Sequence, residues 1–105
     1  MNLGYAIKLV RKELDLTQVE LAERAGVSQT SLSQIENGGK RPSQRTLTKV
    51  CRAMDIPESL LYILGMDESE VPESRREVFQ LIFPAIKSLA MQIVESEHEE
   101  LAMAG

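Results

Sequence analysis

Apolar residues recur along the first 65 positions at intervals of three and four, the spacing that places side chains on one face of an α-helix. Turn-forming residues, mainly glycine, proline and Asn-Gly, divide this pattern into five short segments. The predicted helices begin near Leu3, after Thr17, after Ser28, after Ser43 and at Pro57. The pattern therefore predicts an all-α domain of five helices over residues 1–65.

Local capping signals define the second and third of these helices. Thr17 and Glu20 stand three residues apart, as the two ends of a capping box do. Gly26 is suited to end the second helix, because a glycine after a helix readily adopts positive φ. Ser28 then caps the next helix after a very short turn. Two helices joined in this way cross at a steep angle, which turns much of the second helix outward.

The third predicted helix has an unusual surface. Its strong apolar residues are Leu32 and Ile35, so most of its circumference faces outward. The outward residues carry amide and hydroxyl groups where a surface helix commonly carries Glu and Lys: Gln29, Thr30, Ser31 and Gln34. Such groups can donate and accept hydrogen bonds toward base edges, and glutamine can pair bidentately with adenine. The alternative is a solvated polar helix with no ligand.

Groups suited to phosphate surround this helix. Helix N-termini offer free N–H groups to an anion, and amide or basic side chains beside them can bind phosphate oxygens. The candidate phosphate contacts are Gln18, Ser28, Asn37, Lys40, Arg41 and Arg45. Phosphate contacts on both sides of a polar helix are what positions such a helix in a major groove of double-stranded DNA.

Four stretches closely resemble the XRE family of phage Cro and cI-type repressors, and the likeness covers residues 3–65. They are Thr17-Gln18-Val19-Glu20-Leu21-Ala22, Ala25-Gly26-Val27-Ser28, Leu32-Ser33-Gln34-Ile35-Glu36-Asn37-Gly38 and Arg41-Pro42-Ser43. The resemblance implies a five-helix lambda-repressor-like helix-turn-helix domain. Its third helix, residues 28–36, would enter the major groove, and the protein would bind a palindromic operator as a two-fold dimer.

The resemblance also implies individual roles. Gln29, Thr30 and Gln34 would face bases, and Gln18, Asn37 and Lys40 would meet phosphates. Arg11 and Glu36 would form a structural pair that orients the third helix. One position departs from the pattern, because some relatives carry an arginine directly after the turn proline, where this chain has Ser43. Arg41 and Arg45 flank that position.

Composition agrees with this picture once the chain is divided. The 105 residues have a net charge of −4. Residues 1–65 carry nine Lys or Arg against seven Asp or Glu, and residues 66–105 carry three against nine. The acidity therefore belongs to the second part, whereas the local field of one face decides phosphate binding.

Other kinds of chemistry find little support. Cys51 is the one cysteine and is expected to be a buried core residue, so we expect a reducing compartment. His98 lies in an acidic end with no second ligand at a usual spacing, so no metal is expected. No catalytic set or phosphate-binding glycine loop is present. We predict a cytoplasmic protein that is not an enzyme and needs no cofactor. The apolar stretches are expected to be too short and interrupted to span a membrane, and no signal peptide is expected.

The second part of the chain reads as an acidic linker over residues 66–73, followed by a helical segment over residues 74–105, with Ser74 as a candidate cap. An apolar stripe at spacings of three and four follows: Phe79, Ile82, Ile86, Leu89 and Ile93. Pro84 is expected to split or bend this helix. The segment carries more apolar surface than one stripe can bury, which favours a homodimer contact over folding back on its own domain.

Two functions follow from these patterns. The first is a dimeric transcriptional regulator, in the sense of a repressor, that reads double-stranded DNA. The alternative is an antitoxin or adaptor-type interaction protein whose C-terminal segment binds a protein partner.

Overall fold

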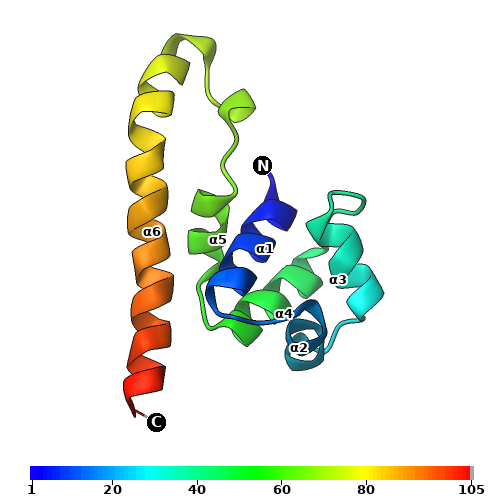
Figure 1. Cartoon of the computed structure of the whole chain (residues 1–105). Coiled ribbons are helices and arrows are strands. Elements are labelled where there is room, and N and C mark those ends of the chain that lie inside the picture. Colours follow the sequence, from blue (N-terminus) through cyan, green and yellow to red (C-terminus); the bar gives the residue numbers. More distant parts are fainter. Residues whose placement is uncertain (105) are drawn as a thin grey trace.

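The computed structural model describes the backbone of residues 1–104 and the side chains of residues 1–96, and its regular structure is helical over that range (Figure 1). The elements in chain order are α1 (Leu3–Glu13), α2 (Gln18–Ala25), α3 (Gln29–Glu36), α4 (Gln44–Met54), α5 (Glu58–Leu64), the 3-10 turns η1 (Glu68–Glu70) and η2 (Glu73–Arg75), and α6 (Arg76–Ala104). The all-α prediction is confirmed.

The helix ends follow the capping residues. Thr17 accepts a hydrogen bond from the backbone of Glu20, whose carboxylate accepts one from the backbone of Thr17, so the capping box is confirmed. Gly26 ends α2 in the left-handed region with φ of 69°. Pro57 is the N-cap of α5 and precedes its first helical residue, one position earlier than expected. Ser74 lies inside η2, and α6 begins at Arg76.

The core of the domain lies among α1 to α5. It is aliphatic, and its fully enclosed side chains include Ile7, Val10, Leu21, Leu32, Ile35, Val50, Leu61 and Leu64. The α2 and α4 helices pack closely, and α1 contacts α3, α4 and α5. Burial of one or two residues per turn is what holds each of these short helices, since isolated helices of this length are marginal in water.

A glycine sets how closely α1 approaches α3. Gly4 is buried, and a Cβ atom at this position would lie 2.0 Å from the carbonyl oxygen of Ile35. Atoms at that separation would overlap, and the obstacle is backbone at the end of α3. The N-terminal turn of α1 therefore rests directly on the last turn of α3 and fixes the depth at which α3 sits in the domain.

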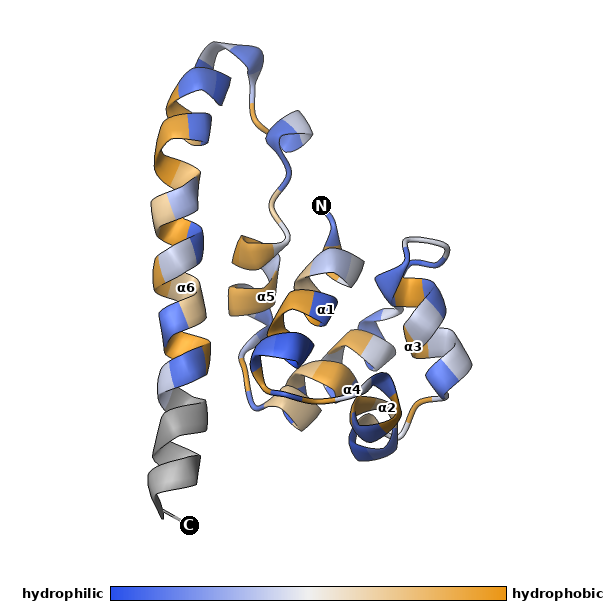
Figure 2. Ribbon diagram, viewed as in Figure 1, coloured by the Kyte–Doolittle hydropathy of each residue, from blue (hydrophilic) through white to orange (hydrophobic). Residues whose placement is uncertain are grey.

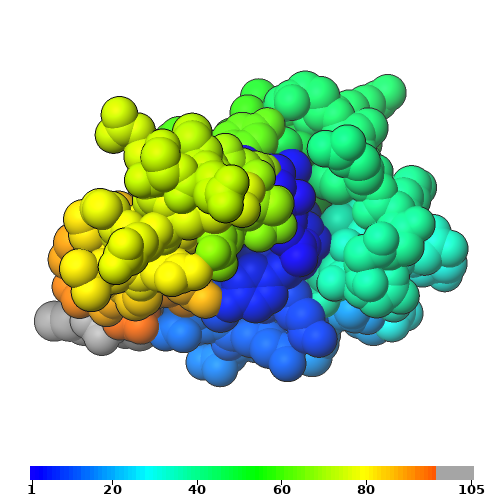
Figure 3. Space-filling model, turned by 90° about the horizontal axis from the view of Figure 1, so that it is seen from above, coloured from blue at the N-terminus to red at the C-terminus, as the bar shows by residue number. Residues whose placement is uncertain are grey.

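The last helix lies beside the domain. After α5 the chain passes through η1 and η2, reverses, and returns as α6 along α5 and α1 (Figure 1). Ala90 and Val94 are buried at this contact, and Lys87 lies over the ring of Tyr5, 4.8 Å from its centre. Seen from above, α6 and the preceding turns occupy one end of the molecule and the chain from α3 to α4 the other (Figure 3).

Pro84 does not split α6. The helix continues unbroken through this residue, so the expected division into two helices is wrong. Proline removes one backbone N–H and normally leaves the carbonyl four residues earlier without a partner. Pro84 is exposed, and so is Gln80, the residue that supplies that carbonyl. Water can therefore satisfy the carbonyl.

Apolar residues recur along α6 (Figure 2), and many of their side chains are exposed. The exposed large apolar side chains of α6 are 42% to 81% accessible to solvent: Val78, Leu81, Ile82, Ile86, Leu89 and Ile93. By length and composition alone, Glu73–Ser96 is long and apolar enough to cross a membrane, so the expectation that the apolar stretches are too short is wrong. The interruptions are mostly uncharged, since Lys87 is the one charge between Val78 and Val94.

Candidate DNA-binding surface

The outward face of α3 forms a shallow polar depression lined by Gln29, Thr30, Ser33 and Gln34. Three of these were expected from the sequence to contact bases, and the structure brings them together. Ser33 was missed. It lies four residues after Gln29, one turn along the same side of the helix, and this spacing could have revealed it.

Ser31, the fourth expected base contact, lies on a different side of α3. Its backbone N–H donates to the hydroxyl of Ser28, 3.0 Å away, which caps the helix. Its own hydroxyl accepts a hydrogen bond from Lys40 Nζ at 3.2 Å. Ser31 therefore holds the turn after α3 against the helix and is not part of the polar depression.

A buried ion pair supports α3 from behind. Arg11 Nε and Nη2 each donate to the carboxylate of Glu36 at 2.8 Å, and Nη1 donates to the carbonyl oxygen of Leu16 at 2.7 Å. Arg11 is 7% exposed and Glu36 9%. The two residues that the family resemblance paired thus form a bidentate bridge between α1 and the last residue of α3.

Gln18 joins the same network. Its Nε2 donates to Glu36 Oε1 at 3.1 Å, while the rest of the side chain is only half buried. A side-chain amide nitrogen has two N–H donors, so one remains for another acceptor. Glu36 therefore links the first turn of α2 to the last turn of α3 and orients an amide at the surface between them.

The other expected phosphate contacts are exposed and lie at the ends of α3 or, for Arg45, on α4. Asn37 is the C-cap of α3, and its side-chain oxygen accepts a hydrogen bond from the backbone of Gly39 at 2.9 Å. Ser28 is the N-cap, and Arg45 is exposed in the first turn of α4. Ser28 and Asn37 thus stand at the two ends of the helix that carries the polar depression.

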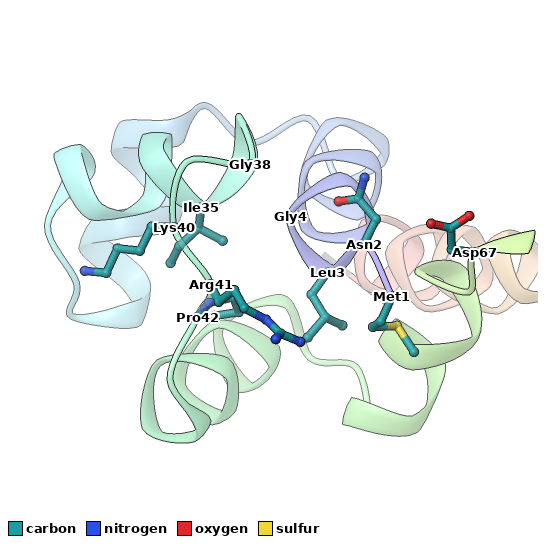
Figure 4. Close-up of a pocket in the computed structure, with 10 residues that line it drawn as sticks. All are labelled: Met1, Asn2, Leu3, Gly4, Ile35, Gly38, Lys40, Arg41, Pro42 and Asp67. Carbon is teal, nitrogen blue, oxygen red and sulfur yellow. The ribbon is translucent and has the colours of Figure 1, made fainter. Parts of the chain in front are cut away.

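The two basic residues of the turn after α3 diverge. Figure 4 shows Arg41 extending toward Leu3, while Lys40 extends the opposite way. Arg41 lines a pocket between this turn and the start of α1, with Asp67 on the far side. The N-terminal ammonium of Met1 pairs with Glu70, and the backbone of Asn2 donates to Gly65. Lys40 is thus directed along α3, and Arg41 toward the N-terminus.

The remaining candidates from the sequence are Cys51 and His98. Cys51 is buried, and burial raises the pKa of its thiol to about 11, with a further contribution from the charge of Glu58. Among the residues whose side chains are described, no cluster of three or more His, Cys, Asp or Glu could hold a metal ion. His98 lies outside those residues.

The steep pair α2–α3, its capped turn and the exposed polar helix define a helix-turn-helix protein. The helix-turn-helix family model matches residues 7–61. The chain belongs to this family, in its XRE or cI-type branch.

Three relatives illustrate the range of similarity. The immunity repressor protein of Bacillus phage phi105 is 42% identical over 77 residues, 73% of this chain and 51% of the relative. The ImmF control region 10 kDa protein of the same phage is 42% identical over 72 residues, 69% and 77% of the two chains. Antitoxin PezA of Streptococcus pneumoniae serotype 4 is 38% identical over 66 residues, 63% and 40%. The chain thus spans about half of the phage repressor.

Proposed function

We propose that this chain binds double-stranded DNA in a sequence-specific manner and regulates transcription as a repressor. The observation that carries the proposal is the face of α3 formed by Gln29, Thr30, Ser33 and Gln34. It is exposed, uncharged and rich in hydrogen-bonding groups, and the Arg11–Glu36 pair holds the helix behind it. Amide and hydroxyl groups of this kind can donate and accept hydrogen bonds at base edges in the major groove.

The polar groups around the face of α3 are suited to contact phosphates. Gln18 has one amide N–H on Glu36 and a second available for a phosphate oxygen, beside the free backbone N–H groups at the start of α2. Lys40 reaches along α3 and can exchange its bond with Ser31 for a phosphate. Such contacts fix the position of the protein on the duplex, whereas the face of α3 reads the sequence. A DNA target also implies that the protein is cytoplasmic.

We further propose that the protein acts as a homodimer through α6. Of the expected dimer contacts, Ile82, Ile86, Leu89 and Ile93 are exposed, while Phe79 is half buried and stacks on Phe83 at 4.6 Å between ring centres. Exposed apolar surface of this extent usually marks a contact. A two-fold dimer would set the recognition helices one DNA turn apart, roughly 34 Å, and bind a palindromic operator.

An interaction protein is the second candidate, favoured by the same open surface of α6. The similarity to an antitoxin supports it, because the name of that relative indicates a protein that acts against a toxin. In this case α6 would hold a different protein in place of a second copy. The two candidates differ in the oligomeric state of the purified chain, which is a monomer only if the partner is foreign.

Selection of binding sites from random DNA with the full chain tests the proposal. The expected result is one palindromic motif. Gln29→Ala should shift the preferred base and weaken binding to the selected site by about 1–3 kcal/mol. Ser88→Ala, an exposed change on α6 far from α3, is the matched control. A random pool without enrichment, or a Gln29→Ala protein with unchanged preference, would overturn the assignment of α3 as the reading helix.

A further inference from the structure

The open surface of α6 lies beside the face that touches the domain. We call Val78, Ile82, Ile86, Leu89 and Ile93 the open face; each is exposed. With 3.6 residues per turn, these positions lie roughly 100° around the helix from the buried residues Ala90 and Val94. A partner helix on the open face would therefore lie beside α6, about a quarter turn around the helix from the side that packs on the domain.

The two ends of the open face are shaped differently. At the beginning of α6 a groove is lined by Arg75, Val78, Ile82 and Ile86 together with Met66 and Val71 of the preceding turns. At the other end a second hollow is lined by Leu89, Gln92, Ile93 and Ser96. Residues of α6 and of the segment before it line the first groove, whereas residues of α6 alone line the second.

Charge is also uneven along the helix. Around the start of α6 the charges balance, with Arg75 and Arg76 against Glu73 and Glu77, whereas the sequence after Val94 contains Glu95, Glu97, Glu99 and Glu100 and no Lys or Arg. Two copies side by side in the same direction would bring these acidic ends together. Opposite directions would separate them by about 30–45 Å at 1.5 Å per residue, well beyond the screening length of about 8 Å.

The geometry points to an antiparallel pair of α6 helices from two copies of this chain, centred between Ala85 and Ile86. In this register Val78 meets the position of Ile93 in the second copy, and Ile82 meets that of Leu89. Each linker-bounded groove then receives the Leu89–Ile93 end of the other helix. The proposal rests on the dimer proposed above and adds its direction and register.

The same arrangement suits DNA binding. The two-fold axis of an antiparallel pair is perpendicular to the plane of the two helices. Because the domain lies about a quarter turn from the open face by the helical periodicity, this axis points toward the domain side. Both domains then extend in the same direction from the helix pair. The α3 helices, at the end of each domain away from α6, can reach one duplex (Figure 1).

Cysteine cross-linking in the full chain tests the direction. Val78→Cys and Ile93→Cys are prepared separately and oxidised alone and as an equal mixture, and the products are identified by mass. An antiparallel pair gives a mixed disulfide between the two variants about tenfold faster than either variant links to itself, because a disulfide requires Cβ atoms roughly 4 Å apart. Native Cys51 is buried and does not compete. Ser88→Cys, exposed but away from the open face, is the control and should link slowly.

The outcomes separate the two proposals. Rapid self-linking of both Val78→Cys and Ile93→Cys means a parallel pair, which overturns the direction and register while the dimer stands. A chain that sediments as a monomer at every concentration overturns the dimer as well. A monomer that binds vesicles of phosphatidylethanolamine and phosphatidylglycerol assigns the open face to a membrane and also overturns the pair. Site selection by α3 is measured independently of all three.

Discussion

Removal of the Glu36 carboxylate should destabilise the protein strongly. In the Glu36→Ala variant, Arg11 Nε and Nη2 lose both acceptors at 2.8 Å, and only the bond from Nη1 to Leu16 remains. Arg11 is 7% exposed, so water cannot replace the carboxylate without opening the contact between α1 and α3. Breaking a buried pair by deleting one partner costs about 3–5 kcal/mol, a large part of the roughly 5–15 kcal/mol that stabilises a typical domain.

A double replacement separates stability from function. In Arg11→Met with Glu36→Leu no charge is left buried, and apolar side chains fill the space. Such replacements are often neutral or stabilising by about 1–4 kcal/mol. Gln18 nevertheless loses its acceptor on α3, so its amide is no longer held at the surface. The carbonyl oxygen of Leu16 also loses its donor on Arg11, which costs about 1–3 kcal/mol. We therefore expect a folded protein, more stable than Glu36→Ala, whose DNA affinity is reduced.

Urea unfolding followed by circular dichroism measures the free energies, and fluorescence anisotropy with the selected operator measures affinity. Glu23→Ala, an exposed carboxylate on α2, is the control and should change the unfolding free energy by less than about 0.5 kcal/mol. A Glu36→Ala protein as stable as this control would refute the buried pair. A double variant with full affinity would refute the positioning of Gln18 by Glu36.

Three further predictions concern separate parts of the domain. Gly4→Ala should lower the thermal midpoint of unfolding, because the new Cβ would meet the Ile35 carbonyl, although helix propensity alone favours alanine by about 1 kcal/mol. A raised midpoint contradicts this contact. Lys8→Ala, on the exposed side of α1, is the control. Lys40→Ala should weaken binding to all DNA sequences alike and reduce the salt-dependence slope by about one unit; a loss confined to one sequence contradicts a phosphate role. The backbone N–H of Thr17 holds the pKa of Glu20 below its ordinary 4.5. The stability that Glu20 contributes is therefore complete above pH 4.5 and is lost as the pH falls through the lowered pKa. The unfolding free energies of Glu20→Gln and wild type should converge in acid, and a difference that stays constant with pH contradicts the capping box.

The helices of the domain were predictable because their signals are local. A capping box, a glycine after a helix and apolar residues three or four apart act within one or two turns, and Thr17 and Gly26 stand where those rules place them. The polar face of α3 was harder to predict. Ser31 and Ser33 are the same residue type two positions apart, but Ser33 lines the polar depression whereas Ser31 accepts a hydrogen bond from Lys40. A helical projection anchored on Gln29 would have favoured Ser33.

Two features of α6 depend on contacts between residues far apart in the sequence, so local patterns could not predict them. The effect of Pro84 depends on whether the carbonyl of Gln80 faces water, and that follows from how α6 lies on the domain. Folding back on the domain and pairing with another chain do not exclude each other. Ala90 and Val94 bury one face of α6 against the domain, while Val78, Ile82 and Leu89 remain open on another.

The two faces of α6 differ in role: one packs on the domain, and the other is open to a partner. The contact through Ala90, Val94 and the Lys87–Tyr5 pair fixes the direction of α6 relative to α1, and α1 fixes α3 through Gly4 and Arg11. The open face therefore stands at a set position relative to α3. If two copies pair through it, the spacing of the two α3 helices follows from packed helices and not from a flexible linker. A change such as Leu89→Glu should then abolish pairing while each domain stays folded, and DNA affinity should fall to that of a single half-site. Ser88→Glu, exposed and next to it, should leave both unchanged, and equal losses in the two variants would mean that α6 does not act through its open face.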